Sequence, residues 1–133
     1  MFKLDERLAA DTVEITRWPL CRVLLMNDAN YPWLVLVPAR PDLRDVIDLP
    51  ALERHTLMDE IARAGEALRA MFKPHKLNVA SLGNAVPQLH IHIISRQTSD
   101  PAWPKPVWGV APAKPYTAEA IAGFRERFIE AAG

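Results

Sequence analysis

The chain has 133 residues, of which 50% are hydrophobic and 24% charged, a composition typical of one globular domain and not of a disordered chain. Its 16 Lys and Arg residues balance 16 Asp and Glu residues, so it lacks the basic excess of a nucleic-acid-binding protein or a polybasic membrane anchor. Its 5 glycines are too scattered to form a glycine-rich phosphate loop.

The cysteine content and the first residues indicate a compartment. Cys21 is the only cysteine, which excludes an intrachain disulfide and a cysteine-based zinc site, and it lies in an apolar stretch typical of a buried residue. Met1–Ala10 is rich in charge, unlike a secretory signal, and no apolar run approaches the ~20 residues of a membrane span. We therefore expect a soluble, cytoplasmic protein without nucleic-acid or membrane partners.

Three segments in the first part of the chain predict strands. Residues 12–18 alternate and are rich in β-formers, and residues 20–26 are mostly apolar. Residues 33–37 are apolar throughout, which is typical of a strand buried on both faces. Asn, Asp and Pro residues over 27–32 predict a turn before this third strand.

Residues 50–72 predict a long helix with one apolar stripe. The stripe consists of Leu57, Ile61, Ala64, Leu68 and Phe72. We expect Asp48, or alternatively Leu49, to cap its start and Lys73-Pro74 to end it. A second helix is predicted over 117–131, with Thr117 as its N-cap.

The remaining segments complete the fold prediction. Residues 76–82 and 88–95 predict a fourth and a fifth strand, and the proline-rich residues 98–116 predict an extended loop. Trp103 and Trp108 either anchor this loop to the sheet, cover the pocket or cross to a partner subunit. The order of elements predicts a single α+β domain over residues 1–133, with a five-stranded, mainly antiparallel sheet that carries helices on one face.

The predicted fifth strand carries the residues with most chemical potential. Gln88, His90 and His92 alternate with apolar residues and therefore share one face. Polar side chains in this pattern are costly to bury without partners. The spacing leaves three interpretations open: a solvated face, two ligands of a metal site that lacks a third, or a neutral imidazole acting as a nucleophile.

The segment Gln88-Leu89-His90-Ile91-His92-Ile93-Ile94 resembles the motif of the histidine triad superfamily, His-φ-His-φ-His-φ-φ, where φ is apolar. Gln88 stands in place of the first histidine. Val86-Pro87 before the motif and Arg96 after it also match members of that family.

A second segment extends this resemblance upstream. Asn27, followed by Tyr31-Pro32-Trp33-Leu34-Val35-Leu36-Val37-Pro38, is similar to the family's Asn…Pro-Gly-His-φ-φ-φ-φ-Pro strand, so the likeness covers residues 12–96. The resemblance implies an antiparallel five-stranded sheet with helices, a nucleotide-binding pocket, and a homodimer in which two sheets join.

The resemblance also implies an activity. Such a protein is a nucleotide hydrolase or nucleotidyl transferase acting on the α-phosphate of a dinucleoside polyphosphate, a nucleoside phosphoramidate or a similar compound. His90 matches the nucleophile, which forms a covalent nucleotidyl-histidine that water then cleaves; one ring nitrogen would donate to a backbone carbonyl and leave the other free. His92 would donate to phosphate oxygens or assist the leaving group, and Gln88 can hydrogen-bond but cannot transfer a proton.

Three residues are candidates for nucleotide binding. Asn27 could contact the ribose or base and Asn84, in the turn before the motif, is a further candidate, although both could equally stabilise turns. Trp33 could stack on a base or fill the core. We expect no metal and no cofactor.

Two other functions stay open. Loss of the first histidine suggests a non-catalytic nucleotide-binding or regulatory module. The His90–His92 pair alternatively suggests a metal-dependent hydrolase.

Overall fold

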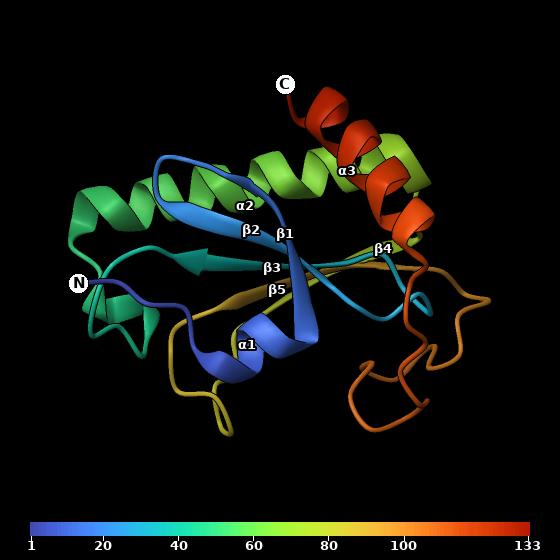
Figure 1. Cartoon of the computed structure of the whole chain (residues 1–133), viewed down its shortest axis with the longest axis horizontal. Coiled ribbons are helices and arrows are strands. Elements are labelled where there is room, and N and C mark those ends of the chain that lie inside the picture. Colours follow the sequence, from blue (N-terminus) through green and yellow to red (C-terminus); the bar gives the residue numbers. More distant parts are fainter.

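The computed structural model describes residues 1–133 and confirms the α+β class, since five strands form one sheet that carries helices (Figure 1). The strands are β1 (Thr12–Arg17), β2 (Cys21–Met26), β3 (Trp33–Pro38), β4 (Lys76–Ala80) and β5 (Ile91–Arg96). They lie in the order β1-β2-β3-β5-β4, and each neighbouring pair is antiparallel. The sheet is therefore antiparallel throughout.

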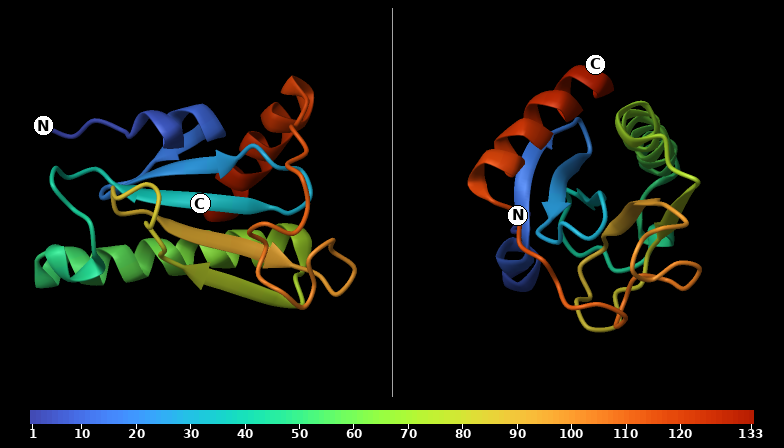
Figure 2. Two further views of the ribbon diagram at one scale, coloured as in Figure 1. Left: turned by 90° about the horizontal axis from the view of Figure 1, so that it is seen from below. Right: turned by 90° about the vertical axis from the view of Figure 1, so that its right-hand side faces the viewer.

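Two helices cover one face of this sheet. The helical elements are α1 (Glu6–Asp11), a 3-10 turn (Val46–Asp48), α2 (Ala51–Phe72) and α3 (Ala118–Ala132). α2 and α3 pack together on one side, whereas α1 and the loop over 98–116 lie on the other (Figures 1 and 2). α1 was not predicted from the sequence; it is short and is capped by the Asp5 side chain. None of the helices has the length and apolar character needed to cross a membrane.

The helix ends agree with prediction except at the start of α2. Pro50 is its N-cap, so neither Asp48 nor Leu49 has that role. Asp48 instead ends the preceding 3-10 turn, and its carboxylate accepts from the backbone N–H groups of Arg44 and Asp45 just before that turn. α2 ends at Phe72, and its C-cap Lys73 takes the left-handed conformation (φ 49°). Thr117 caps α3, as predicted.

Apolar side chains are buried on both faces of the sheet. The core beneath α2 and α3 includes Leu34, Leu36, Leu57, Leu68, Ile91, Ile93, Phe124 and Phe128. The core on the opposite face contains Leu8, Leu24, Tyr31, Trp33, Val35, Val37, Ile94, Ala102 and Val107. β3 is buried along its whole length, as predicted for a strand covered on both sides.

β5 begins later than predicted. Gln88, Leu89 and His90 precede it, because the N–H of Leu89 donates to the carbonyl of Leu43, outside the sheet, at 3.0 Å. The predicted alternation nevertheless holds: Leu89, Ile91 and Ile93 lie in the core beneath α2, while His92 faces the other side. β4 also ends earlier than predicted.

Arg96 ties the proline-rich loop to the end of β5. Its guanidinium is buried and donates to both carboxylate oxygens of Asp100, at 2.8 and 3.1 Å, and to the carbonyl of Lys105 at 2.8 Å. Burial acts to raise the pKa of Asp100, but hydrogen bonds, above all from Arg96, hold it below its usual value. Trp103 lies against the guanidinium and anchors this part of the loop.

Cys21 is buried, as predicted. The N–H groups of Leu20 and Cys21 donate to the buried Glu60 carboxylate of α2, at 3.0 and 2.9 Å. Burial, assisted by the charge of Glu60, raises the pKa of the thiol well above its usual value. Cys21 is therefore a neutral core residue, and Glu60 fastens α2 to the connection between β1 and β2.

Candidate active site

His90 lies immediately before β5 and is buried, with 6% of its surface exposed. Its Nδ1 is 2.7 Å from the carbonyl oxygen of Gln88. A carbonyl oxygen only accepts, so Nδ1 carries a proton, and in the neutral ring the lone pair is on Nε2. This is the backbone contact expected, from the family resemblance, of a nucleophilic histidine.

His92 lies beside His90 on the same side of the sheet, with the two rings 4.9 Å apart and edge-on. The indole N–H of Trp33 donates to Nδ1 of His92 at 3.0 Å. Burial, with a smaller contribution from His90, lowers the pKa of His92 to about 4. His92 is therefore neutral at pH 7, and its own proton is on Nε2.

Two tryptophans enclose the His92 ring. Trp33 comes from the start of β3, and Trp108 comes from the proline-rich loop. The ring of Trp108 stands edge-on to His92 at 5.0 Å and to Trp33 at 5.7 Å. Trp33 is a core residue that also reaches the site, so the two roles considered for it are not exclusive.

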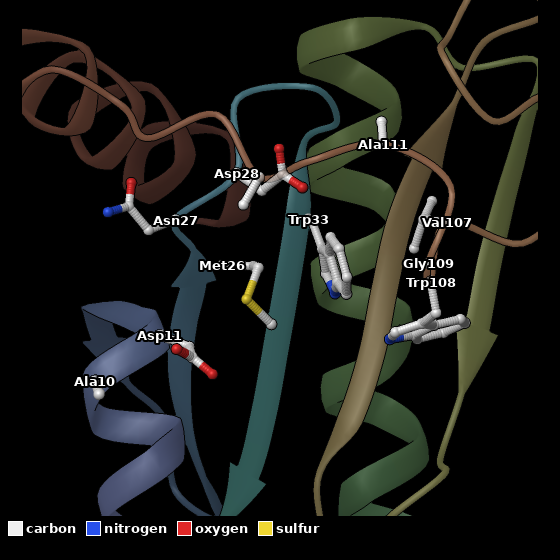
Figure 3. Close-up of a pocket in the computed structure, with 11 residues that line it drawn as sticks. Ala10, Asp11, Met26, Asn27, Asp28, Trp33, Val107, Trp108, Gly109 and Ala111 are labelled. Atoms are coloured by element: carbon white, nitrogen blue, oxygen red, sulfur yellow. The ribbon is translucent and has the colours of Figure 1, made fainter.

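A cleft of about 370 Å³ opens next to these tryptophans (Figure 3). It is lined by Ala10, Asp11, Met26, Asn27, Asp28, Trp33, Val107, Trp108, Gly109, Ala111 and Ala113. In Figure 3, Trp33 and Trp108 stand on one side of it, and Asp11 at the end of α1 lies on the other. Most of the residues that line the cleft are hydrophobic and a few are polar, which is typical of small-molecule sites.

Asn27 lines the cleft and also holds one wall in place. Its side-chain oxygen accepts from the N–H of Tyr116 at 2.8 Å, while the neighbouring Asp28 carboxylate accepts from the N–H of Lys114 at 3.2 Å. These bonds fasten the segment that follows Trp108. Asn84 is solvent-exposed and lies outside the residues that line the cleft.

Gln88 uses its side chain away from the histidine rings. Its Nε2 donates to the carbonyl of Lys3, and its Oε1 accepts from the N–H of Asp5, both at 2.8 Å. Both ends of the amide are therefore occupied by the N-terminal main chain. Only the backbone carbonyl of Gln88 acts on His90.

The two site histidines have no third protein ligand for a metal. No group of three or more His, Cys, Asp or Glu side chains comes together anywhere in the chain. Trp33 already occupies Nδ1 of His92.

Comparison with known proteins identifies the family. A family model described as the HIT domain matches residues 7–99. The chain belongs to the HIT domain family. No curated protein matches it at a significant level.

Three solved structures resemble this HIT protein over nearly their whole length. A histidine triad protein from Bradyrhizobium japonicum is 47% identical, with a TM-score of 0.97 and coverage of 99% of this chain and 98% of the other. One from Sinorhizobium meliloti is 42% identical (TM-score 0.96, coverage 98% and 96%). One from Marinobacter aquaeolei is 45% identical (TM-score 0.95, coverage 100% and 99%).

Sequence reasoning missed part of the HIT protein's cleft. Asp11 was not considered because α1 was not predicted, although Asp5 followed by Glu6 and Arg7 is an N-terminal signal for a helix. Val107 and Gly109 lie in a loop whose path no periodic pattern indicates. Their place in the cleft depends on contacts with residues far away in the sequence.

Proposed function

We propose that this HIT protein is a nucleotide hydrolase or nucleotidyl transferase that uses His90 as its nucleophile. The observation that carries the proposal is the 2.7 Å contact between Nδ1 of His90 and the carbonyl of Gln88. It orients the ring and leaves Nε2 free to attack. The adjoining cleft supplies the room and the aromatic surface that a nucleoside needs.

The proposed reaction has two steps. Nε2 of His90 attacks the α-phosphorus of a dinucleoside polyphosphate, a nucleoside phosphoramidate or a similar compound. A nitrogen–phosphorus bond forms as the bond to the leaving group breaks, and Nδ1–H stays bonded to Gln88. Water, or another acceptor, then attacks phosphorus; the electron pair returns to Nε2, and the acceptor's proton passes to solvent.

The cleft suggests how the nucleoside is held. Its base would lie against Trp33 and Trp108, whose faces offer apolar contact. The Nδ2 group of Asn27 is available to a ribose or base oxygen, since the bond to Tyr116 uses only the side-chain oxygen. The Nε2–H of His92 would donate to a phosphate oxygen.

Trapping of the covalent intermediate tests this function. The protein is mixed with diadenosine tetraphosphate carrying a ³²P label at the α-phosphate, then denatured and analysed for an acid-labile adduct. We expect an adduct with the native protein and with His75→Ala, which removes an exposed histidine, and none with His90→Ala. An equal adduct in His90→Ala would exclude His90 as the nucleophile.

A non-catalytic nucleotide-binding module is the second candidate. It is favoured by Gln88, which replaces the first histidine of the motif and whose amide is bonded to the N-terminal main chain, so the site has two histidines rather than three. This function predicts nucleotide binding by calorimetry without adduct or turnover. Turnover that depends on His90 would exclude it.

We further propose that two copies join through β4 to form a homodimer. β4 is an edge strand of the sheet, so one side of its backbone is unpaired. Met58 on α2 and Val79 on β4 are 63% and 52% exposed and border an apolar groove of about 180 Å³. A second copy would extend the sheet and cover this surface. HIT proteins are often dimeric.

A further inference from the structure

The hydrogen bond between Trp33 and His92 determines which ring nitrogen of His92 holds a proton. An indole nitrogen is a donor and never an acceptor, so Nδ1 of His92 must be the acceptor in the 3.0 Å contact. A proton on Nδ1 would break this bond. The contact therefore favours a neutral ring with its proton on Nε2.

The surroundings of His92 contain nothing that would stabilise a positive charge. The residues paired with it on the neighbouring strands are Val35 and Ala80. Trp108 closes the side facing the proline-rich loop. The only titratable group whose charge acts on it is His90, which opposes a second positive charge nearby.

We propose that Trp33 locks His92 as a neutral hydrogen-bond donor, so that this site suits leaving groups that depart as stable anions and disfavours those that must be protonated. The preference for a class of leaving group rests on the proposed function. The claim that His92 is a neutral donor rests on its contact with Trp33 and does not depend on the proposed function.

The substrate preference follows from the proton balance of the first step. When Nε2 of His90 attacks, the electron pair of the broken bond leaves with the leaving group. A phosphate leaving group accepts it as a stable anion, and the Nε2–H of His92 needs only to hydrogen-bond to that oxygen. An amine leaving group must receive a proton as the nitrogen–phosphorus bond breaks, because an amide anion is too basic to depart.

No side chain beside His90 can supply that proton at neutral pH. His92 is neutral, and a neutral imidazole is a very weak acid. The amide of Gln88 cannot ionise and is bonded to Lys3 and Asp5. Loss of a general acid typically slows a reaction by about 10²–10⁴-fold, and only the amine substrates need one here.

The first test measures the tautomer of His92 without any substrate. Nitrogen-15 NMR of the full chain should show His92 with its proton on Nε2 from pH 5.5 to 8. In Trp33→Phe, which keeps a ring but removes the N–H, we expect mixed tautomers and a His92 pKa higher by about one pH unit. Trp108→Phe is the matched control, because Trp108 touches the same ring without such a bond, and it should keep the native tautomer.

Measurements on the native protein alone can overturn the claim that Trp33 keeps His92 neutral. A proton on Nδ1 of His92, or a His92 that titrates near pH 6.5, would overturn it even if Trp33→Phe failed to fold. An unchanged tautomer in folded Trp33→Phe would also overturn it.

The second test compares two substrates that share an adenylyl group. Single-turnover formation of adenylyl-His90 from diadenosine tetraphosphate should be at least about 100-fold faster than from an adenosine 5′-phosphoramidate of an alkylamine. The ratio of the rate from diadenosine tetraphosphate to the rate from the phosphoramidate should fall by up to about tenfold at pH 6 in Trp33→Phe. The reason is that a larger fraction of His92 is then protonated and can donate a proton to the leaving amine. Because the nucleoside is the same, the ratio cancels changes in nucleoside binding.

The outcomes separate this inference from the function on which it rests. Equal rates, or a faster phosphoramidate, would overturn the substrate preference while supporting His90 as nucleophile. Adduct formation with neither compound would overturn the proposed function and the preference together. The NMR result would still decide the role of Trp33.

Discussion

The carbonyl oxygen of Gln88 lies 2.7 Å from Nδ1 of His90, so the residue that replaces the first histidine of the motif acts on the site through its backbone. A backbone carbonyl is present whatever the side chain. The side-chain amide of Gln88 does not contact His90 and instead hydrogen-bonds to the main chain at Lys3 and Asp5. Substitution of Gln88 should accordingly change stability more than chemistry.

Gln88→Ala tests this separation. We expect a loss of about 1–3 kcal/mol in the free energy of unfolding, because two hydrogen bonds to the N-terminal main chain disappear. The His90 tautomer, read by nitrogen-15 NMR, should not change. Gln97→Ala, which removes an amide that donates to the carbonyls of Phe72 and Lys73, is a control remote from His90. A His90 proton that moved to Nε2 in Gln88→Ala alone would contradict the prediction.

The stability of the protein should fall as the pH drops from about 6.5 to 4, in part because of His92. The folded protein holds the pKa of His92 near 4, below the value of about 6.5 expected in the unfolded chain. In that window the unfolded chain binds a proton that the folded protein does not, so acid favours unfolding. The contribution of His92 to the free energy of unfolding is fully present above pH 6.5, and about 3 kcal/mol of it is lost by pH 4.

Urea denaturation across this pH range measures the effect. His92→Gln should reduce the slope of unfolding free energy against pH, whereas His75→Gln, at an exposed position, should leave it unchanged. Identical slopes in the native protein and His92→Gln would show that His92 titrates normally.

Arg96→Met should destabilise the protein by about 3–5 kcal/mol. The substitution leaves the Asp100 carboxylate buried without its cation and frees the loop that carries Trp108. Thermal unfolding measures the loss, and nucleotide affinity should fall with it. Arg17→Met, which removes an exposed partner of Glu14, should cost less than about 1 kcal/mol. Similar losses in both variants would show that Arg96 is not the anchor of the loop.

Charges placed at the β4 edge should separate the proposed dimer. In Val79→Lys combined with Met58→Lys, two side chains of like charge replace exposed apolar ones on β4 and the neighbouring α2. Light scattering after size exclusion should give twice the chain mass for the native protein and the single mass for the variant. Ile129→Glu on α3 is a matched control at another exposed apolar position. A native protein of single mass would refute the proposal.

Local patterns were sufficient to predict most of the fold. The stripe of α2, the alternation of β5 and the continuous apolar run of β3 each depend on residues close together in the sequence, and each is confirmed. The errors lie at ends and short elements. α1 was missed, and β5 starts later than its alternation indicates, because the contact of Leu89 with Leu43 spans distant segments.

The sequence by itself determined the α+β class, the pairing of His90 with His92 on one face, and the likeness to the histidine triad family. Periodicity and motif spacing suffice for these. Only the tertiary structure decided that Trp33 donates to His92, that the Gln88 amide binds the N-terminal main chain, and that Trp108 reaches the site. Each of these contacts joins segments far apart in the chain, and their chemistry depends on hydrogen-bond direction and burial, which no local pattern records.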